Sequence, residues 1–153
     1  MIALADVVGG SQNRRCLAST LRILDLSDNN ITSIGFEYFC RQLVKNFTIE
    51  RLCLDRNPLS KGNRFQIFRL LLQSTKSLTY LSIRNVFLEQ EDFLYLSEGM
   101  EYNTSLIEFD MSENYLERTA FLQVCQFLKV NRILKVLHLT KCNISDDGVS
   151  QLA

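Results

Sequence analysis

Several features that would point to a particular function are scarce or missing in this sequence of 153 residues. One proline and no tryptophan are present, which excludes Pro-rich linkers. The single histidine, His138, has no second histidine with which to form a metal site or a catalytic relay. Seventeen basic and seventeen acidic residues cancel. No whole-chain field would therefore attract nucleic acid or an anionic membrane, and we expect neither as a partner.

Targeting, membrane-spanning and catalytic signals are missing as well. The apolar runs are too short to span a bilayer, and residues 1–8 lack the basic leading segment of a secretory signal. Five cysteines, an odd number without the spacing of metal ligands, indicate reduced thiols and a cytoplasmic or nuclear protein. The sequence contains no phosphate-binding glycine loop and no nucleophile elbow. We therefore predict a protein that is not an enzyme and needs no cofactor or metal.

What the sequence does contain is an internal repeat. Leu21-x-x-Leu24-x-Leu26 is followed by an asparagine at 29 and an isoleucine at 31, and this pattern of apolar residues returns four times. The copies begin at residues 21, 49, 78, 106 and 134, so that the steps are 28, 29, 28 and 28 residues. Such a constant step is typical of a protein built from stacked repeats. The period of two residues within each copy predicts a short strand.

The second half of each unit has the spacing of an amphipathic helix. In the first unit Phe36, Phe39, Cys40 and Leu43 are three or four residues apart, and the following units repeat this spacing. Each unit is therefore predicted to be a strand, a turn and a helix of about three turns. We expect residues 1–20 to form a partial repeat helix and a long loop. We expect residues 21–153 to form the repeat array, with its last unit truncated and the native chain continuing beyond both ends.

The repeats resemble the leucine-rich repeats, specifically the ribonuclease-inhibitor-like class. The resemblance implies an α/β fold: a right-handed solenoid shaped like a horseshoe, with a parallel sheet on the concave face and helices on the convex face. It also implies that the asparagine after each strand ties its side chain to neighbouring backbone groups in a ladder. Val86 occupies this position in the third unit and cannot donate a hydrogen bond, so we expect a looser or water-satisfied turn there. At the ladder position Asn29, Asn57 and Asn114 match the family, and Cys142 is a substitution that the family often accepts.

A second set of asparagines recurs where each helix returns to the next strand. Asn46, Asn103 and Asn131 occupy equivalent places in their units. Asn46 and Asn103 also match the glycosylation sequon. Because the position recurs with the repeat, we predict that these side chains cap the turn.

Function is expected at the variable strand positions, which face the concave surface between the framework leucines. These positions are acidic in the first unit, mixed to basic in the second and third, acidic in the fourth and more basic in the fifth. One interpretation is a solvated face with interspersed charges. The other is a protein-binding surface, since tyrosine and arginine are enriched at binding hot spots. Bound RNA is disfavoured by the acidic rows and the zero net charge. The candidate binding residues are Arg51, Asp55, Arg56, Tyr80, Arg84, Glu108, Asp110, Glu113, His138 and Lys141.

These observations predict a module that binds another protein inside the cell. A rigid stacked sheet would hold its side chains in fixed rows, so that little ordering entropy is lost on binding. Two alternatives remain open. Ran GTPase-activating proteins use the same repeat class, so the chain could be part of a small-GTPase regulator. It could also be the sensor end of a nucleotide-binding innate immune receptor.

Overall fold

The computed structural model describes residues 20–60 and 65–150, in which strands and helices alternate five times. The predicted partial helix and loop at residues 1–20 and the end of the last unit lie outside the described residues, apart from Thr20. The five strands are β1 (Ile23–Asp25), β2 (Arg51–Cys53), β3 (Tyr80–Ser82), β4 (Glu108–Asp110) and β5 (Val136–His138). The helices are α2 (Ser33–Leu43), α3 (Gln66–Ser74), α4 (Gln90–Tyr102), α5 (Arg118–Val130) and α6 (Asp146–Val149).

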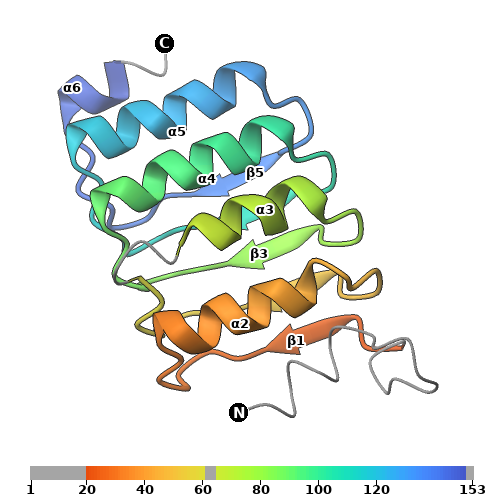
Figure 1. Cartoon of the computed structure of the whole chain (residues 1–153). Coiled ribbons are helices and arrows are strands. Elements are labelled where there is room, and N and C mark those ends of the chain that lie inside the picture. The colour runs from red at the N-terminus through yellow and green to blue at the C-terminus, as the bar shows by residue number, and fades with distance from the viewer. Residues whose placement is uncertain (1–19, 61–64, 151–153) are drawn as a thin grey trace.

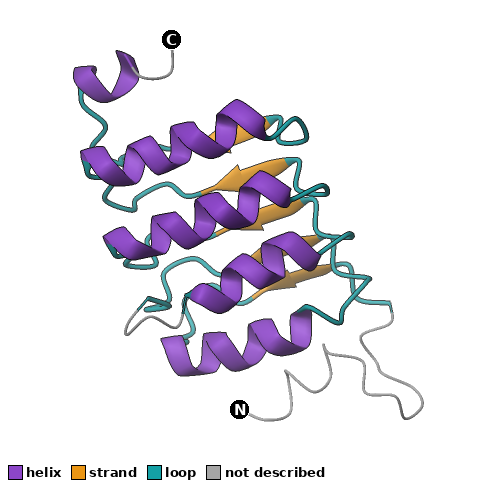
Figure 2. Cartoon of the chain, turned by 45° about the horizontal axis from the view of Figure 1, so that its top comes forward, coloured by secondary structure: helices purple, strands orange, loops and turns teal. Residues whose placement is uncertain are grey.

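The strands form one parallel sheet in the order of the chain, β1-β2-β3-β4-β5. The helices cover one side of this sheet and leave the other side open, as Figures 1 and 2 show. The register pairs Leu52 with Leu81 and Leu81 with Phe109, so that the central framework side chains stack across the strands. All three are fully buried. The predicted α/β leucine-rich-repeat solenoid is confirmed.

The buried side of the helices follows the predicted spacing. In α2, Phe36 and Cys40 are completely buried, and the ring of Phe36 lies 5.4 Å from that of Phe65 and 5.3 Å from that of Phe68, centroid to centroid. In α4, Gly99 allows a close approach to α3, because a Cβ atom there would lie 2.9 Å from Leu72 Cδ1. The helices therefore pack through apolar contacts between successive units, as a repeat that cannot bury its own apolar face requires.

Asn57 links the first two units by five hydrogen bonds. Its Oδ1 accepts from the backbone N–H groups of Asn29 (3.0 Å) and Ile31 (2.8 Å). Its Nδ2 donates to the carbonyls of Leu26 (2.8 Å), Leu54 (2.9 Å) and Asp55 (3.2 Å). The side chain is fully buried and thus pairs backbone groups that the sheet ladder does not reach.

The other ladder positions differ in what they contact. Asn114 donates to the Ile83 carbonyl in the preceding unit (2.8 Å). Cys142 does the same through its thiol, toward the Met111 carbonyl at 3.5 Å. Asn29 is exposed, and among the described residues its amide donates only to the Ser27 carbonyl (2.8 Å). The ladder therefore runs backward, from Asn57, Asn114 and Cys142 to the unit before each of them.

The expected looser turn at Val86 is not found. Its side chain is fully buried, and its N–H donates to Asn114 Oδ1 at 3.0 Å. Asn85 has a positive φ of 49°, close to the 53° of Arg56 at the equivalent position. The turn keeps its shape because the following unit supplies the acceptor. Val86 cannot donate to the Leu54 carbonyl in the preceding unit. Among the side chains of the described residues, only Asn57 donates to that carbonyl.

The turns from helix to strand are held by the second set of asparagines. Asn103 Oδ1 accepts from the N–H groups of Ser105 (3.1 Å) and Leu106 (2.7 Å), and its Nδ2 donates to the Leu72 carbonyl at 2.6 Å. Asn46 and Asn131 accept from the following turn in the same way. These contacts agree with the capping role expected from the spacing.

Candidate protein-binding surface

The sheet register brings residues from all five strands into two rows on the open side of the sheet, which we call the concave face. The first row runs through the first residue of each strand and the second row through the third. The rows are Ile23, Arg51, Tyr80, Glu108 and Val136, then Asp25, Cys53, Ser82, Asp110 and His138.

The charged residues in the turns just after the strands pair between neighbouring units. Arg56 donates two hydrogen bonds to the Asp28 carboxylate, at 2.8 and 2.6 Å, and this pairing lowers the pKa of Asp28. Arg84 donates to Glu113 at 2.8 Å. The Arg56–Asp28 pair is exposed and contributes little to stability, whereas the Arg84–Glu113 pair is partly buried. Both pairs neutralise charges that a partner would otherwise meet.

The fourth and fifth units are paired in the same manner. His138 Nε2 lies 3.1 Å from Glu108 Oε1, and Lys141 Nζ lies 3.9 Å from Glu113 Oε1. The banding seen in the sequence therefore has a structural origin, since each charged residue faces its complement 28 to 30 residues along the chain. Of these four residues Lys141 is the most exposed, at 76% of its side chain.

Two of the candidate residues hold turns of the fold. Asp55 Oδ1 accepts from the Ser82 hydroxyl (2.5 Å) and from the Arg84 N–H (2.9 Å). Asp110 is only 8% exposed and accepts from the Ser112 N–H at 2.9 Å. The Asp55 carboxylate is thus occupied by the end of β3 and the turn after it, and the Asp110 carboxylate by the turn after its own strand.

Arg51 and Tyr80 are arranged differently. The Arg51 guanidinium carbon lies 3.7 Å from the centroid of the Tyr80 ring, which is a cation–π geometry. Arg51 is exposed, and in residues 20–60 and 65–150 no carboxylate lies within ion-pair distance of it. Ile23 lies beside it in the register and is 62% exposed. This part of the concave face therefore offers an ordered cation that has no acidic partner among the described residues, next to apolar surface.

The four cysteines of the described residues are poor candidates for chemistry. Burial raises the pKa of the Cys40, Cys125 and Cys142 thiols. Cys53 is half-buried on the concave face, and its pKa is raised by burial and by the carboxylates of Asp25 and Asp55. A raised pKa keeps each thiol protonated and unreactive.

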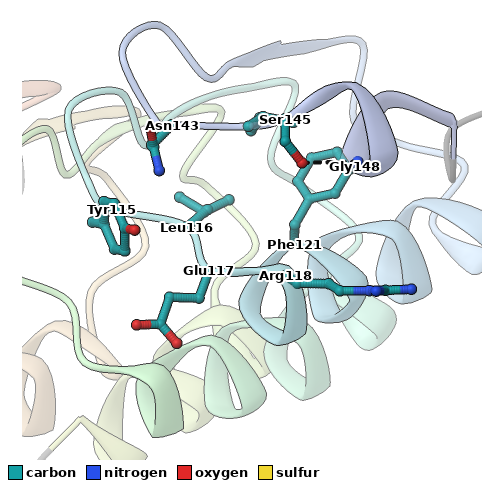
Figure 3. Close-up of a pocket in the computed structure, with 9 residues that line it drawn as sticks. Tyr115, Leu116, Glu117, Arg118, Phe121, Asn143, Ser145 and Gly148 are labelled. Atoms are coloured by element: carbon teal, nitrogen blue, oxygen red, sulfur yellow. Dashed lines mark hydrogen bonds between the residues drawn. The ribbon is translucent and has the colours of Figure 1, made fainter.

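The sequence interpretation missed a second exposed region, in the turns that lead from strand to helix. Phe87 and Tyr115 are 63% and 61% exposed. They occupy the same place in successive units, so comparing that place across the repeats could have found them. Next to Tyr115 lies a pocket of about 220 Å³ (Figure 3). Its lining residues are Tyr115, Leu116, Glu117, Arg118, Phe121, Asn143, Ile144, Ser145 and Gly148.

Two other features, a membrane-spanning helix and a metal-binding cluster, are absent from the described ranges. Across residues 20–60 and 65–150, no helix has both the length and the apolar composition needed to cross a bilayer. The same residues contain no group of three or more potential ligands placed to hold a metal ion.

Comparison with known proteins agrees with the geometry. A family model described as "Leucine Rich repeat" matches residues 18–40 and 130–153. Ribonuclease inhibitor from Sus scrofa is 30% identical over 137 residues, which are 89% of this chain. The chain is a leucine-rich-repeat protein of the ribonuclease-inhibitor-like class. It spans about 30% of the length of that ribonuclease inhibitor.

Two further similarities come from a longer protein and from a solved structure. The "NACHT, LRR and PYD domains-containing protein 5" of Mus musculus is 29% identical over 140 residues, 91% of this chain and 12% of that protein. The solved leiomodin-1 actin-binding site 2 superposes with a TM-score of 0.74 over 85% of this chain and 75% of its own. Its sequence identity is 14%, so that it supports the leucine-rich-repeat fold alone.

Proposed function

We propose that this leucine-rich-repeat protein is an interaction module of the cytoplasm or nucleus that binds another protein on its concave face. The leucine-rich repeat is generally a protein-interaction module, and the pig relative is named for inhibiting a ribonuclease. The observation that carries the proposal is the Arg51–Tyr80 stack, because it is the ordered cation of the concave face that lacks an acidic partner among the described residues.

The chemistry of the stack indicates what the partner presents. A guanidinium held against an aromatic ring has already lost part of its rotamer freedom, so binding orders it at little further cost. Its remaining N–H groups can donate two parallel hydrogen bonds to a carboxylate. Ile23 provides apolar contact beside it. We therefore infer a partner that places an aspartate or glutamate, flanked by an apolar side chain, over β1 and β2.

The experiment compares proteins captured from a cell lysate by the immobilised wild type, by Arg51→Glu and by Lys45→Glu. Lys45 is a matched control for charge reversal because it is exposed next to the end of α2 and makes no ion pair with a described residue. Glu98 is unsuitable, since it accepts from Arg69 at 2.5 Å. A partner retained by Lys45→Glu should bind Arg51→Glu about tenfold or more weakly. Equal retention by both variants would overturn the proposal, provided that their melting temperatures match the wild type.

A second candidate function is that of a repeat segment within a larger multidomain protein, as the name of the mouse relative describes for that protein. The similarity over 91% of this chain favours it. An immunoblot of the native gene product with an antibody against this chain tests it. A band well above 17.7 kDa is expected, and a band at that mass would exclude this role.

A further inference from the structure

Phe87 adopts a backbone conformation that a bulky side chain rarely occupies. Its φ is +60°. The equivalent residues of the first and last units, Asn30 and Asn143, also have positive φ values, 52° and 57°. Asparagine tolerates this left-handed region, whereas an aromatic residue there is strained. The side chain of Phe87 is 63% exposed, so that burial does little to offset the strain. A strained and exposed aromatic residue is the kind of feature that binding sites retain.

Phe87 and Tyr115 lie in adjacent strand-to-helix turns. The N–H of Val86 donates to Asn114 Oδ1 at 3.0 Å, which fixes the two strand-to-helix turns side by side. Tyr115 follows Asn114 directly and is 61% exposed. We call this two-residue surface the aromatic edge. It lies at the end of the strands where each one turns toward its helix, apart from the Arg51–Tyr80 stack on the sheet.

The pocket beside Tyr115 extends the aromatic edge toward the last unit. Figure 3 shows Tyr115 on one side, Ser145 and Gly148 across from it, and the apolar side chain of Leu116 between them. Leu116 and Phe121 are each 2% exposed, so buried core residues form part of the pocket lining. Its volume of about 220 Å³ suits one apolar side chain of a partner.

The charged groups around the aromatic edge are mostly acidic. Glu89, Glu91 and Glu117 are exposed in or just after the same two turns, where Arg118 is the opposing charge. The Glu89 side chain accepts from the start of α4, while Glu117 has no ion pair with any residue of the described ranges. In Figure 3 the Glu117 carboxylate points away from the pocket and toward α4. A basic side chain lying over an aromatic ring here would find both a π face and a carboxylate.

We propose that the aromatic edge docks an extended segment of a partner protein that carries lysine or arginine next to an apolar residue. The apolar side chain enters the pocket above Leu116, and the basic side chain lies over Tyr115 and Phe87 near Glu117. This inference rests on the proposed role as an interaction module. It differs from that proposal in surface and in sign, since the concave face offers a cation and the aromatic edge offers carboxylates.

The probe is a random peptide library displayed on phage and panned on the wild-type protein, followed by titration of the enriched peptides as synthetic, labelled molecules. Enriched sequences should pair lysine or arginine with an apolar residue. Phe87→Asn should bind them about tenfold or more weakly, because it removes the ring. The same variant should melt at a higher temperature than the wild type, since asparagine relieves the backbone strain.

Phe47→Ser is the matched control. Phe47 is 72% exposed but lies in a helix-to-strand turn, at the opposite end of the strands, so its loss should not change peptide affinity. Enriched peptides without basic residues, or unaffected by Phe87→Asn, would overturn the inference. Peptides that respond to Arg51→Glu and not to Phe87→Asn would overturn it while supporting the concave face. A lower melting temperature for Phe87→Asn would show that Phe87 serves the fold and would also overturn it.

Discussion

Replacing Asn57 by alanine should lower the free energy of unfolding by about 2–4 kcal/mol. The side chain is fully buried and makes five hydrogen bonds to the backbone of the first two units. The bond to the Leu54 carbonyl is itself buried, and leaving such a group unpaired costs about 1–3 kcal/mol. Water can reach the four groups that are partly buried, so their loss adds less than a full penalty each.

Urea denaturation, monitored by circular dichroism and by tyrosine fluorescence, measures this change. If the two transitions coincide, a two-state analysis is justified. Asn29→Ala is the control, because Asn29 is exposed and its amide makes a single hydrogen bond to a described residue, so the loss should be below about 0.5 kcal/mol. Val86→Asn should be neutral or stabilising, since it can offer the Leu54 carbonyl a second donor. Equal midpoints for Asn57→Ala and Asn29→Ala would refute the backward-running ladder.

Three further predictions concern packing and charge. Gly99→Ala should lower the free energy of unfolding by about 1–3 kcal/mol, because the new Cβ would lie 2.9 Å from Leu72 Cδ1, and an unchanged thermal midpoint would contradict this. Burial raises the pKa of Asp92 above 3.8, so that on acidification the folded state takes up this proton at a higher pH than the unfolded chain does. The free energy of unfolding should therefore rise as the pH falls from the raised pKa to 3.8. Asp92→Asn should remove this rise in urea titrations at several pH values. Arg84→Glu should lower the thermal midpoint, since it would place a third carboxylate beside Glu113 and Asp110, and added salt should restore part of the loss. A midpoint equal to the wild type would show that these ion pairs do not contribute to stability.

The fold could be predicted from the sequence because the apolar pattern recurs with an almost constant step. A step of 28 or 29 residues places Leu52 beside Leu81, and the structure pairs these two residues in register. The ladder role of Asn57 was implied by the resemblance of this pattern to the leucine-rich repeats, and the structure shows its hydrogen bonds. The error at Val86 came from judging the turn by its own side chain, whereas the turn is held by Asn114 from the next unit.

The candidate site was predicted less completely, because its geometry depends on side-chain reach. The sequence placed Arg51 and Tyr80 on one face, but the stacking of the guanidinium on the ring depends on rotamers. Phe87 was missed because a positive φ in a bulky residue is a property of the folded turn.

The sequence by itself determined the repeat: where each strand and helix falls, and which residues lie next to each other from one unit to the next. Side chains 28 or 29 residues apart become neighbours because parallel strands lie about 4.8 Å apart in a sheet. Only the tertiary structure decided which of those neighbours pair. Arg56 and Arg84 reach carboxylates of adjacent units, while Arg51 lies on a ring and keeps its charge available. The physical reason is that repeat spacing fixes backbone positions, whereas hydrogen bonding, burial and backbone strain depend on the rotamers and dihedral angles that packing selects.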